Sequence, residues 1–149
     1  MAAKIFSEYA FKHTVKFVAF SGEKNGLYGS SAYARDAYKH GERIIADIQL
    51  DGVGHAVSRR GGNIIRLSTN GESTWITDIA QDMIDMYGNY IELGILRQRN
   101  FPGSDHQSFL NYGYEGVFFL EYEFNPHYHS PQDTIEHVNI SCASLLLQP

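Results

Sequence analysis

Acidic and histidine side chains follow apolar, strand-like runs at several places in the chain, and this arrangement constrains the fold more than any other feature. The pattern occurs in four blocks, at residues 17–30, 48–51, 103–109 and 125–134. In open α/β sheets, loops at the carboxyl ends of the strands carry the groups that bind ligands. The blocks therefore favour an α/β fold with a functional site at one edge of the sheet.

Strand-like and helix-like segments alternate along the chain, which is typical of an α/β domain. β-Branched and aromatic runs predict strands over residues 14–20, 43–50, 63–68, 92–97 and 116–121. The strand over residues 92–97 is expected near an edge and that over residues 116–121 in the centre. Apolar spacing predicts helical segments over residues 3–12, 30–40, 73–87, 105–111 and 135–147.

Length and composition predict a single globular domain over residues 1–149. The net charge of −5 and the absence of a basic cluster argue against nucleic acid or an anionic membrane as a partner. No apolar run reaches the roughly 18 residues of a membrane span, and the N-terminal residues do not resemble a signal peptide. The cellular location therefore stays open. Cys142 is the single cysteine, which excludes an internal disulfide.

Two acids stand out in the first two blocks. Glu23 lies in a loop bracketed by glycines, a place that suits a general base, a metal ligand or simply a solvated loop residue. Asp51 follows an apolar run and precedes Gly52. That position suits a ligand fixed at the end of a strand and, equally, a residue that forms a turn.

Two histidines, His127 and His129, flank Tyr128 in the last block. Imidazole is the commonest neutral metal ligand, and alternation in an extended loop sends the two rings to opposite sides. One ring can then bind a metal while the other faces solvent. Asp133, just beyond, suits capping of the last helix as well as catalysis.

Ser104, Asp105 and His106 contain the residue types of a catalytic triad, but their arrangement excludes one. Three consecutive side chains cannot readily face one another, and no nucleophile-elbow glycine pattern surrounds the serine. A role in binding substrate or in supporting other site residues is favoured instead.

Taken together, the four blocks resemble the zinc aminopeptidase family of bacterial leucyl aminopeptidases. The wider superfamily includes glutaminyl cyclases and non-catalytic members such as the transferrin receptor ectodomain. The resemblance implies a three-layer fold, in which helices flank a mixed, mainly parallel sheet, and a peptide or aminoacyl substrate. It further implies that the chain is the C-terminal portion of such a domain, truncated at its N-terminus and shortened at its C-terminus.

The resemblance also implies roles for individual residues. Glu23 matches the general base that activates a water held by zinc, of which the family binds one or two ions. Asp51 matches a ligand of one zinc ion, and His129 matches a ligand of the other. The stretch that lines the substrate pocket is matched by Ser104, Asp105 and His106.

Lys24 is the clearest departure from the family, which usually has a second glutamate, a zinc ligand, at this place. An ammonium about 4 Å from a dication is repelled by roughly 8 kcal/mol at an effective dielectric of about 20. The family's His-x-Asp ligand motif and bridging Asp would precede this chain, and a carbonyl-polarising Tyr falls near Phe101. Only Asp51 and His129 remain of the expected ligands, whereas zinc sites generally have at least three from the protein.

Three functions stay open from the sequence. The first is a zinc aminopeptidase-type metallopeptidase that hydrolyses N-terminal peptide bonds, impaired in this chain and dependent on a complementing N-terminal segment. The second is a non-catalytic binding module of the same fold, for which exposed apolar surface favours a homo-oligomer or another partner. The third is a mononuclear zinc enzyme similar to glutaminyl cyclases, in which Glu23 joins Asp51 and His129 as a ligand.

Overall fold

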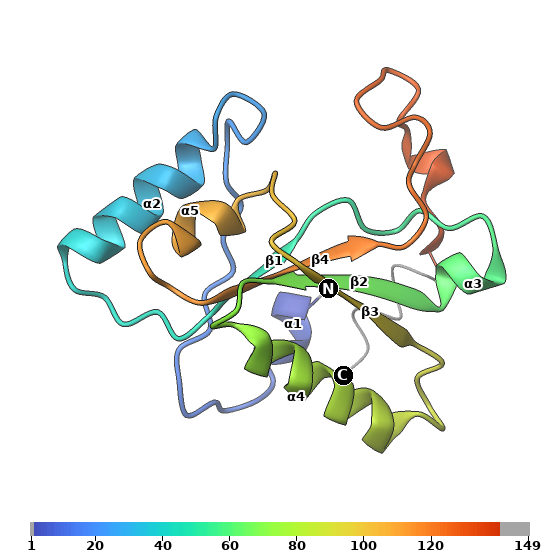
Figure 1. The fold of residues 1–149 in the computed structure, drawn as a ribbon, viewed down its shortest axis with the longest axis horizontal. Helices are drawn as coiled ribbons and strands as arrows, with labels where there is room; N and C mark the ends of the chain where they lie inside the picture. Colours follow the sequence, from blue (N-terminus) through green and yellow to red (C-terminus); the bar gives the residue numbers. More distant parts are fainter. Residues whose placement is uncertain (1, 141–149) are drawn as a thin grey trace.

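A computed structural model describes residues 2–140 as a four-stranded mixed sheet with helices on both faces (Figure 1). The strands are β1 (Asp47–Leu50), β2 (Ile64–Thr69), β3 (Gly94–Arg99) and β4 (Gly116–Glu121). The helices are α1 (Ala2–Phe6), α2 (Tyr28–Lys39), α3 (Arg59–Gly62), α4 (Thr74–Tyr87), α5 (His106–Leu110) and the 3-10 turn η1 (Ile135–His137). The predicted α/β class is confirmed.

The sheet has the strand order β1-β4-β2-β3. β1 pairs in parallel with β4, β2 pairs in parallel with β3, and the two halves meet where β2 runs antiparallel to β4. β4 is therefore an inner strand and β3 an edge strand, as predicted. The other edge of the sheet among the described residues is β1.

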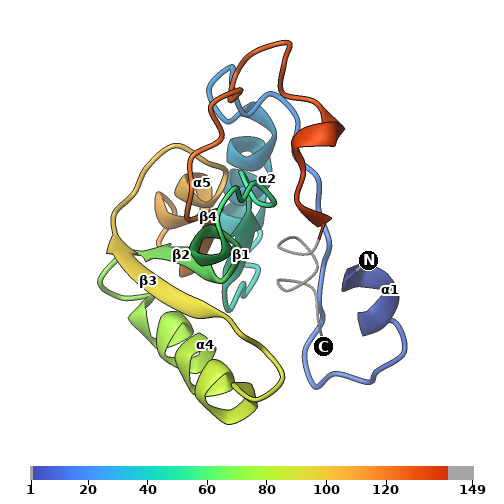
Figure 2. The same ribbon diagram turned by 90° about the vertical axis from the view of Figure 1, so that its right-hand side faces the viewer.

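The core lies between the sheet and α4. Its fully buried members are Leu67 on β2 and Val117 on β4, and Ile76 of α4 packs against them. α4 has the amphipathic spacing predicted for it, so one face of the helix is apolar and covers β2, β3 and β4. α2 and α5 pack together on the opposite face, which confirms the three-layer arrangement (Figures 1 and 2).

The predicted strand over residues 14–20 is wrong. This segment has no strand assignment, and its backbone forms no hydrogen bond with the backbone of any other described residue. Figure 2 shows the segment running beyond β1, at the end of the sheet opposite β3. The composition favours a strand, but a strand needs a neighbour to pair with, and none is described beside this segment.

Both ends of the chain differ from the predicted helices. α1 ends at Phe6, so the helix expected over residues 3–12 is short. Near the C-terminus, η1 is a single turn, and most of the predicted helix over residues 135–147 lies outside the described residues. Asp133 does not cap that turn, because its carboxylate accepts a hydrogen bond from Asn125 instead (2.7 Å). Within residues 2–140, no helix is long and apolar enough to cross a bilayer.

Candidate functional site

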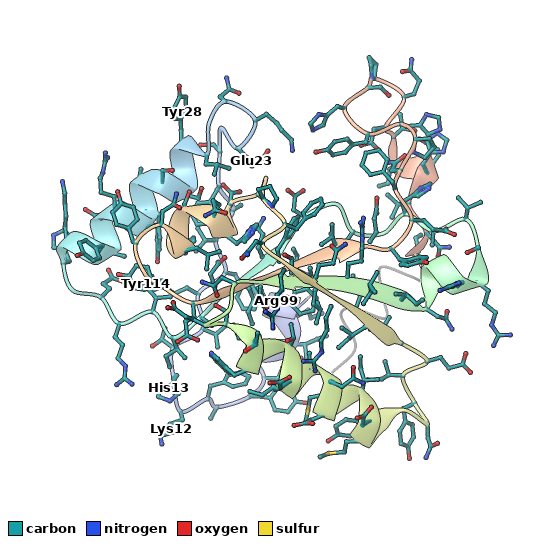
Figure 3. All side chains as sticks on the ribbon, in the orientation of Figure 1. Lys12, His13, Glu23, Tyr28, Arg99 and Tyr114 are labelled. Carbon is teal, nitrogen blue, oxygen red and sulfur yellow. The ribbon has the colours of Figure 1, made fainter. Side chains whose placement is uncertain are left out.

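A cavity of about 1130 Å³ opens between the N-terminal segment and β1. Its walls are formed mainly by residues 13–20 and 42–51, and Glu23, Asp51 and Asp105 all line it. Glu23 lies on the loop before α2, at the opposite end of the N-terminal segment from His13 (Figure 3). The structure thus brings three of the predicted site residues, Glu23, Asp51 and Asp105, to one cavity.

Asp51 is held at the end of β1 by contacts with the loop before α5 and with β4. Its backbone N–H donates to the carbonyl of Phe119 (3.4 Å), and its carboxylate accepts a hydrogen bond from Ser104 Oγ (2.7 Å). Gln49 Nε2 in turn donates to the same serine oxygen (3.1 Å). Gly52 has a φ of 60°, a left-handed conformation that glycine adopts readily and that turns the chain immediately after Asp51. This network fixes the orientation of the Asp51 carboxylate.

A pair of buried carboxyl groups, Asp47 and Asp105, also lines the cavity. Burial raises the pKa of Asp47 to about 7, and repulsion by Asp105 adds to the shift. Asp47 Oδ2 and Asp105 Oδ1 are both buried without a hydrogen-bond partner among the described residues. Unpaired buried polar atoms are unusual in proteins, so these two oxygens mark a place where a hydrogen-bond donor is expected.

His106 is buried behind the site. Its ring stacks on Phe118 with the centroids 4.8 Å apart, and its Nδ1 atom has no hydrogen-bond partner among the described residues. Burial lowers the pKa of the imidazole, against the opposing effects of a hydrogen bond to the backbone of Phe101 and the charge of Asp51. Ser104, Asp105 and His106 are all buried, and Asp105 is the member of this stretch that lines the cavity.

Lys24 forms a bridge between two loops. Its ammonium lies 2.8 Å from the Glu23 carboxylate, in an ion pair, and it donates a hydrogen bond to Tyr128 Oη (3.3 Å). The loop that carries Glu23 is thereby connected to the loop that carries His129. Lys24 is therefore paired with the carboxylate of Glu23, the residue that matches the family's general base.

The two histidines of the last block have different surroundings. His129 has a φ of 60°, and its ring stacks on Tyr128 with the centroids 3.7 Å apart. His127 stacks instead on His137 of η1, with the centroids 4.2 Å apart. His129 does not line the cavity that Glu23 and Asp51 share, although Lys24 brings its loop close to theirs.

The described residues do not form a complete zinc site. Within residues 2–140, no group of three or more His, Cys, Asp or Glu side chains is placed to hold a metal ion. Asp51 is bound to Ser104 and Glu23 is bound to Lys24, so two of the acids already have partners. Phe101 has no hydroxyl group with which to polarise a carbonyl. A closed zinc site therefore requires ligands from outside these residues.

Sequence reasoning did not single out Asp47 or Gln49. Asp47 contributes a buried carboxyl group to the cavity, and Gln49 fixes the serine that holds Asp51. The available signal was the presence of two polar side chains within an otherwise apolar run that forms a strand. Such side chains need partners when the strand is buried.

The sequence pattern of peptidase family M28 matches residues 1–145. The chain is 30% identical over 130 residues to leucine aminopeptidase 1 of Coccidioides posadasii, covering 83% of this chain and 33% of that protein. It is 25% identical over 143 residues to aminopeptidase YwaD of Bacillus subtilis, covering 92% of this chain and 30% of that protein. Because the match spans almost the whole sequence, the chain belongs to peptidase family M28.

Solved structures agree with this fold. LapB from Legionella pneumophila is similar with a TM-score of 0.82 at 19% identity, over 98% of this chain and 40% of that one. BSAP, a zinc aminopeptidase from Bacillus subtilis, gives a TM-score of 0.66 at 27% identity, over 85% of this chain and 32% of that one. The chain spans about a third of the length of the curated relatives that it matches.

Proposed function

We propose that this chain is the part of an aminopeptidase-type metallopeptidase domain that supplies the general base and two of the zinc ligands. Glu23 is the base, and Asp51 and His129 are the ligands. The peptide or aminoacyl substrate lies in the cavity that Glu23 and Asp51 both line. The remaining ligands come from polypeptide outside the 149 residues, so the chain alone is impaired.

The observation that carries the proposal is the family match combined with the position of Glu23 and Asp51 on one cavity. Zinc aminopeptidases are among the relatives and structural neighbours, which supports zinc as the metal. The hydrogen bond from Ser104 holds the Asp51 carboxylate in one orientation, as a supporting residue does for a metal ligand.

The Glu23 carboxylate can act as a proton acceptor at this site. A carboxylate at a hydrolytic site takes a proton from the attacking water and returns it to the departing amine. The adjacent Lys24 ammonium competes for the same carboxylate, at 2.8 Å. The lysine must therefore turn away before Glu23 can act, and this requirement is a physical reason for low activity.

The same ion pair favours a second candidate, a non-catalytic module of the M28 fold. A lysine in contact with Glu23 and Tyr128 links the two loops without a metal. The mononuclear alternative is weaker, since it needs Glu23 as a zinc ligand while Lys24 already neutralises that carboxylate.

Zinc titration of the whole chain, followed by NMR of the histidine rings, tests the proposal. We expect the His129 signals to shift first, with a dissociation constant of the order of 1 mM or weaker, because this chain supplies only one ligand to each zinc ion. The double variant Asp51→Ala/His129→Ala should lose this binding. The matched control is Asp36→Ala/His40→Ala, which removes the same residue types from an exposed ion pair at the C-terminal end of α2 and should retain zinc binding.

Two results would contradict the proposed function. One is zinc binding that is the same in both double variants. The other is a complex with the completing polypeptide that, when loaded with zinc, leaves leucyl-p-nitroanilide uncleaved. In an active complex, the Glu23→Gln variant should lose hydrolysis and keep zinc, because Glu23 is the base and not a ligand. Loss of zinc from this variant would instead support the mononuclear enzyme.

A further inference from the structure

Arg66 on β2 lies in a row of residues that crosses the sheet from Asp51. Leu50 of β1 pairs with Phe119 of β4. The next step along both strands brings Asp51 level with Leu120, and Leu120 pairs in turn with Arg66. Residues that are level in neighbouring strands project from the same face of a sheet. Because neighbouring strands lie about 4.8 Å apart, the backbones of Asp51 and Arg66 are about 10 Å apart on that face.

Two hydrogen bonds connect the Arg66 side chain to the same end of β1. Arg66 Nε donates to the carbonyl of Glu121 (2.7 Å). The N–H of Glu121 donates to the carbonyl of Gly52 (2.9 Å), the residue that directly follows Asp51. The guanidinium is thus held by one edge, near the residue that is the candidate zinc ligand.

The positive charge of Arg66 is not paired with an acid. Within residues 2–140, no ion pair includes this half-buried arginine. Its two terminal guanidinium nitrogens have no hydrogen-bond partner in the described part of the chain. The carboxylate of the neighbouring Glu121 accepts a hydrogen bond from the N–H of His55 instead (2.8 Å). Arg66 therefore keeps N–H donors that a ligand can use.

The surface around Arg66 is apolar and partly open. α5 packs over β1 and β4, whereas Leu96, which pairs with Arg66 on the β3 side, is 41% exposed. The ring of Phe101 lies beside the guanidinium, with its centroid 6.0 Å from Cζ, and this residue is also 41% exposed. A cation bounded by apolar side chains is screened less by water, so it attracts an anion more strongly than a fully exposed cation does.

We propose that Arg66 is a specificity-determining residue that binds a carboxylate of the substrate, so that this chain favours acidic peptides. The free N–H groups of a guanidinium match the two oxygens of a carboxylate in a planar, bidentate pair. Such a carboxylate comes from the side chain of the first substrate residue or from the C-terminal end of a short peptide. The inference deepens the proposed function, on which it rests for the position of the substrate beside Asp51.

Titration of the whole zinc-free chain at low salt tests the inference without a need for activity. NMR of the arginine Nε–H groups follows Arg66 directly. Glutamic acid α-amide offers only a side-chain carboxylate, and leucyl-glycine offers only a C-terminal one. We expect at least one of them to shift the Arg66 signal. It should bind at least about threefold more tightly than its uncharged counterpart, glutamine amide or leucyl-glycinamide.

A matched set of variants locates the contact. Arg66→Met keeps an unbranched apolar stem without the charge, so the preference for the carboxylate compound should disappear. Arg99→Met makes the same change at an exposed residue of β3 outside this row, and the preference should remain. Arg66→Lys keeps the charge and should retain part of the preference. This last variant separates lost recognition from lost folding, since both substitutions remove the guanidinium that supports the Glu121 carbonyl.

Equal binding within both pairs of compounds, or a preference that survives in Arg66→Met, would overturn the inference. In an active complex with the completing polypeptide, Arg66→Met should raise KM at least about threefold for the favoured carboxylate substrate, glutamyl-p-nitroanilide or leucyl-glycine. Leucyl-p-nitroanilide, which has no carboxylate, should keep its KM. A complex that cleaves none of these substrates contradicts the proposed function, and the titration of the chain alone still decides the role of Arg66.

Discussion

Residues 14–20 and β2 have the same kind of sequence and opposite outcomes. Both are β-branched or aromatic runs that predict a strand. β2 pairs with β3 on one side and β4 on the other, and Leu67 at its centre is fully buried. The N-terminal segment pairs with no described strand, and Phe17 is half exposed. The difference teaches that local propensity does not make a strand without a partner.

The largest expected effect comes from truncating the same kind of side chain in the two regions. Leu67→Ala should lower the free energy of unfolding by about 2–5 kcal/mol, because it leaves a cavity among Ile65, Ile76 and Val117. Val18→Ala in the N-terminal segment should change it by less than about 0.5 kcal/mol. Urea denaturation measures both values, and equal losses would remove the contrast.

A pH effect on stability is expected from Asp47. Its folded-state pKa of about 7 lies above the ordinary value of 3.8, so the folded state binds more protons between these pH values. Stability is therefore greatest below about pH 4 for this group and falls as pH rises toward 7. Relative to Asp47→Asn, the wild type should lose about 1–3 kcal/mol between pH 4 and 8.

Thermal or urea unfolding of wild type and Asp47→Asn at several pH values checks this expectation. The difference between the two proteins is the relevant quantity, because other groups titrate in both. A difference that stays constant across this range would show that the Asp47 carboxyl group is not buried beside Asp105.

An effect of similar size is expected where the buried side chain of Ser73 supports the first residue of β4. Ser73 is fully buried, and its Oγ accepts a hydrogen bond from the N–H of Gly116, the first residue of β4 (3.0 Å). Ser73→Ala leaves that N–H without a partner and should cost about 1–3 kcal/mol. Ser7→Ala removes an exposed hydrogen bond near the N-terminus and should cost almost nothing. Similar losses in urea denaturation would contradict this difference in burial.

The smallest stability effect is expected at Lys24. Its ion pair with Glu23 is half exposed on the lysine side, so Lys24→Met should change the free energy of unfolding by less than about 1 kcal/mol. Lys16→Met, which breaks an exposed pair with Glu42, serves as the matched control. A large loss only for Lys24 would show that its bridge to Tyr128 holds the two loops together.

Much of the fold was predictable from local patterns. The helix over residues 73–87 was predicted from its apolar stripe and from Gly88, and α4 begins one residue later and ends at Tyr87. The central position of β4 followed from its apolar run. The strand predicted over residues 14–20 was wrong because strand formation depends on pairing with neighbours, which the segment's own sequence does not reveal.

The candidate site was predictable in part. The motifs predicted Glu23 and Asp51 as site residues, and both line one cavity. The hydrogen bond from Ser104 to Asp51 connects residues far apart in sequence, so local spacing could not reveal it. Asp47 was missed because its burial beside Asp105 depends on how α5 packs against β1.

Amide hydrogen exchange of the isolated chain tests the central claim most directly, namely that among residues 2–140 the sheet ends at an open β1 edge. We predict strong protection in β2 and rapid exchange throughout residues 14–20. Within β1, Gln49 should be protected, whereas Ile48 and Leu50 should exchange quickly. Protection of residues 14–20, or of Ile48 and Leu50, at the level of β2 would show that the edge is already paired and would contradict the account.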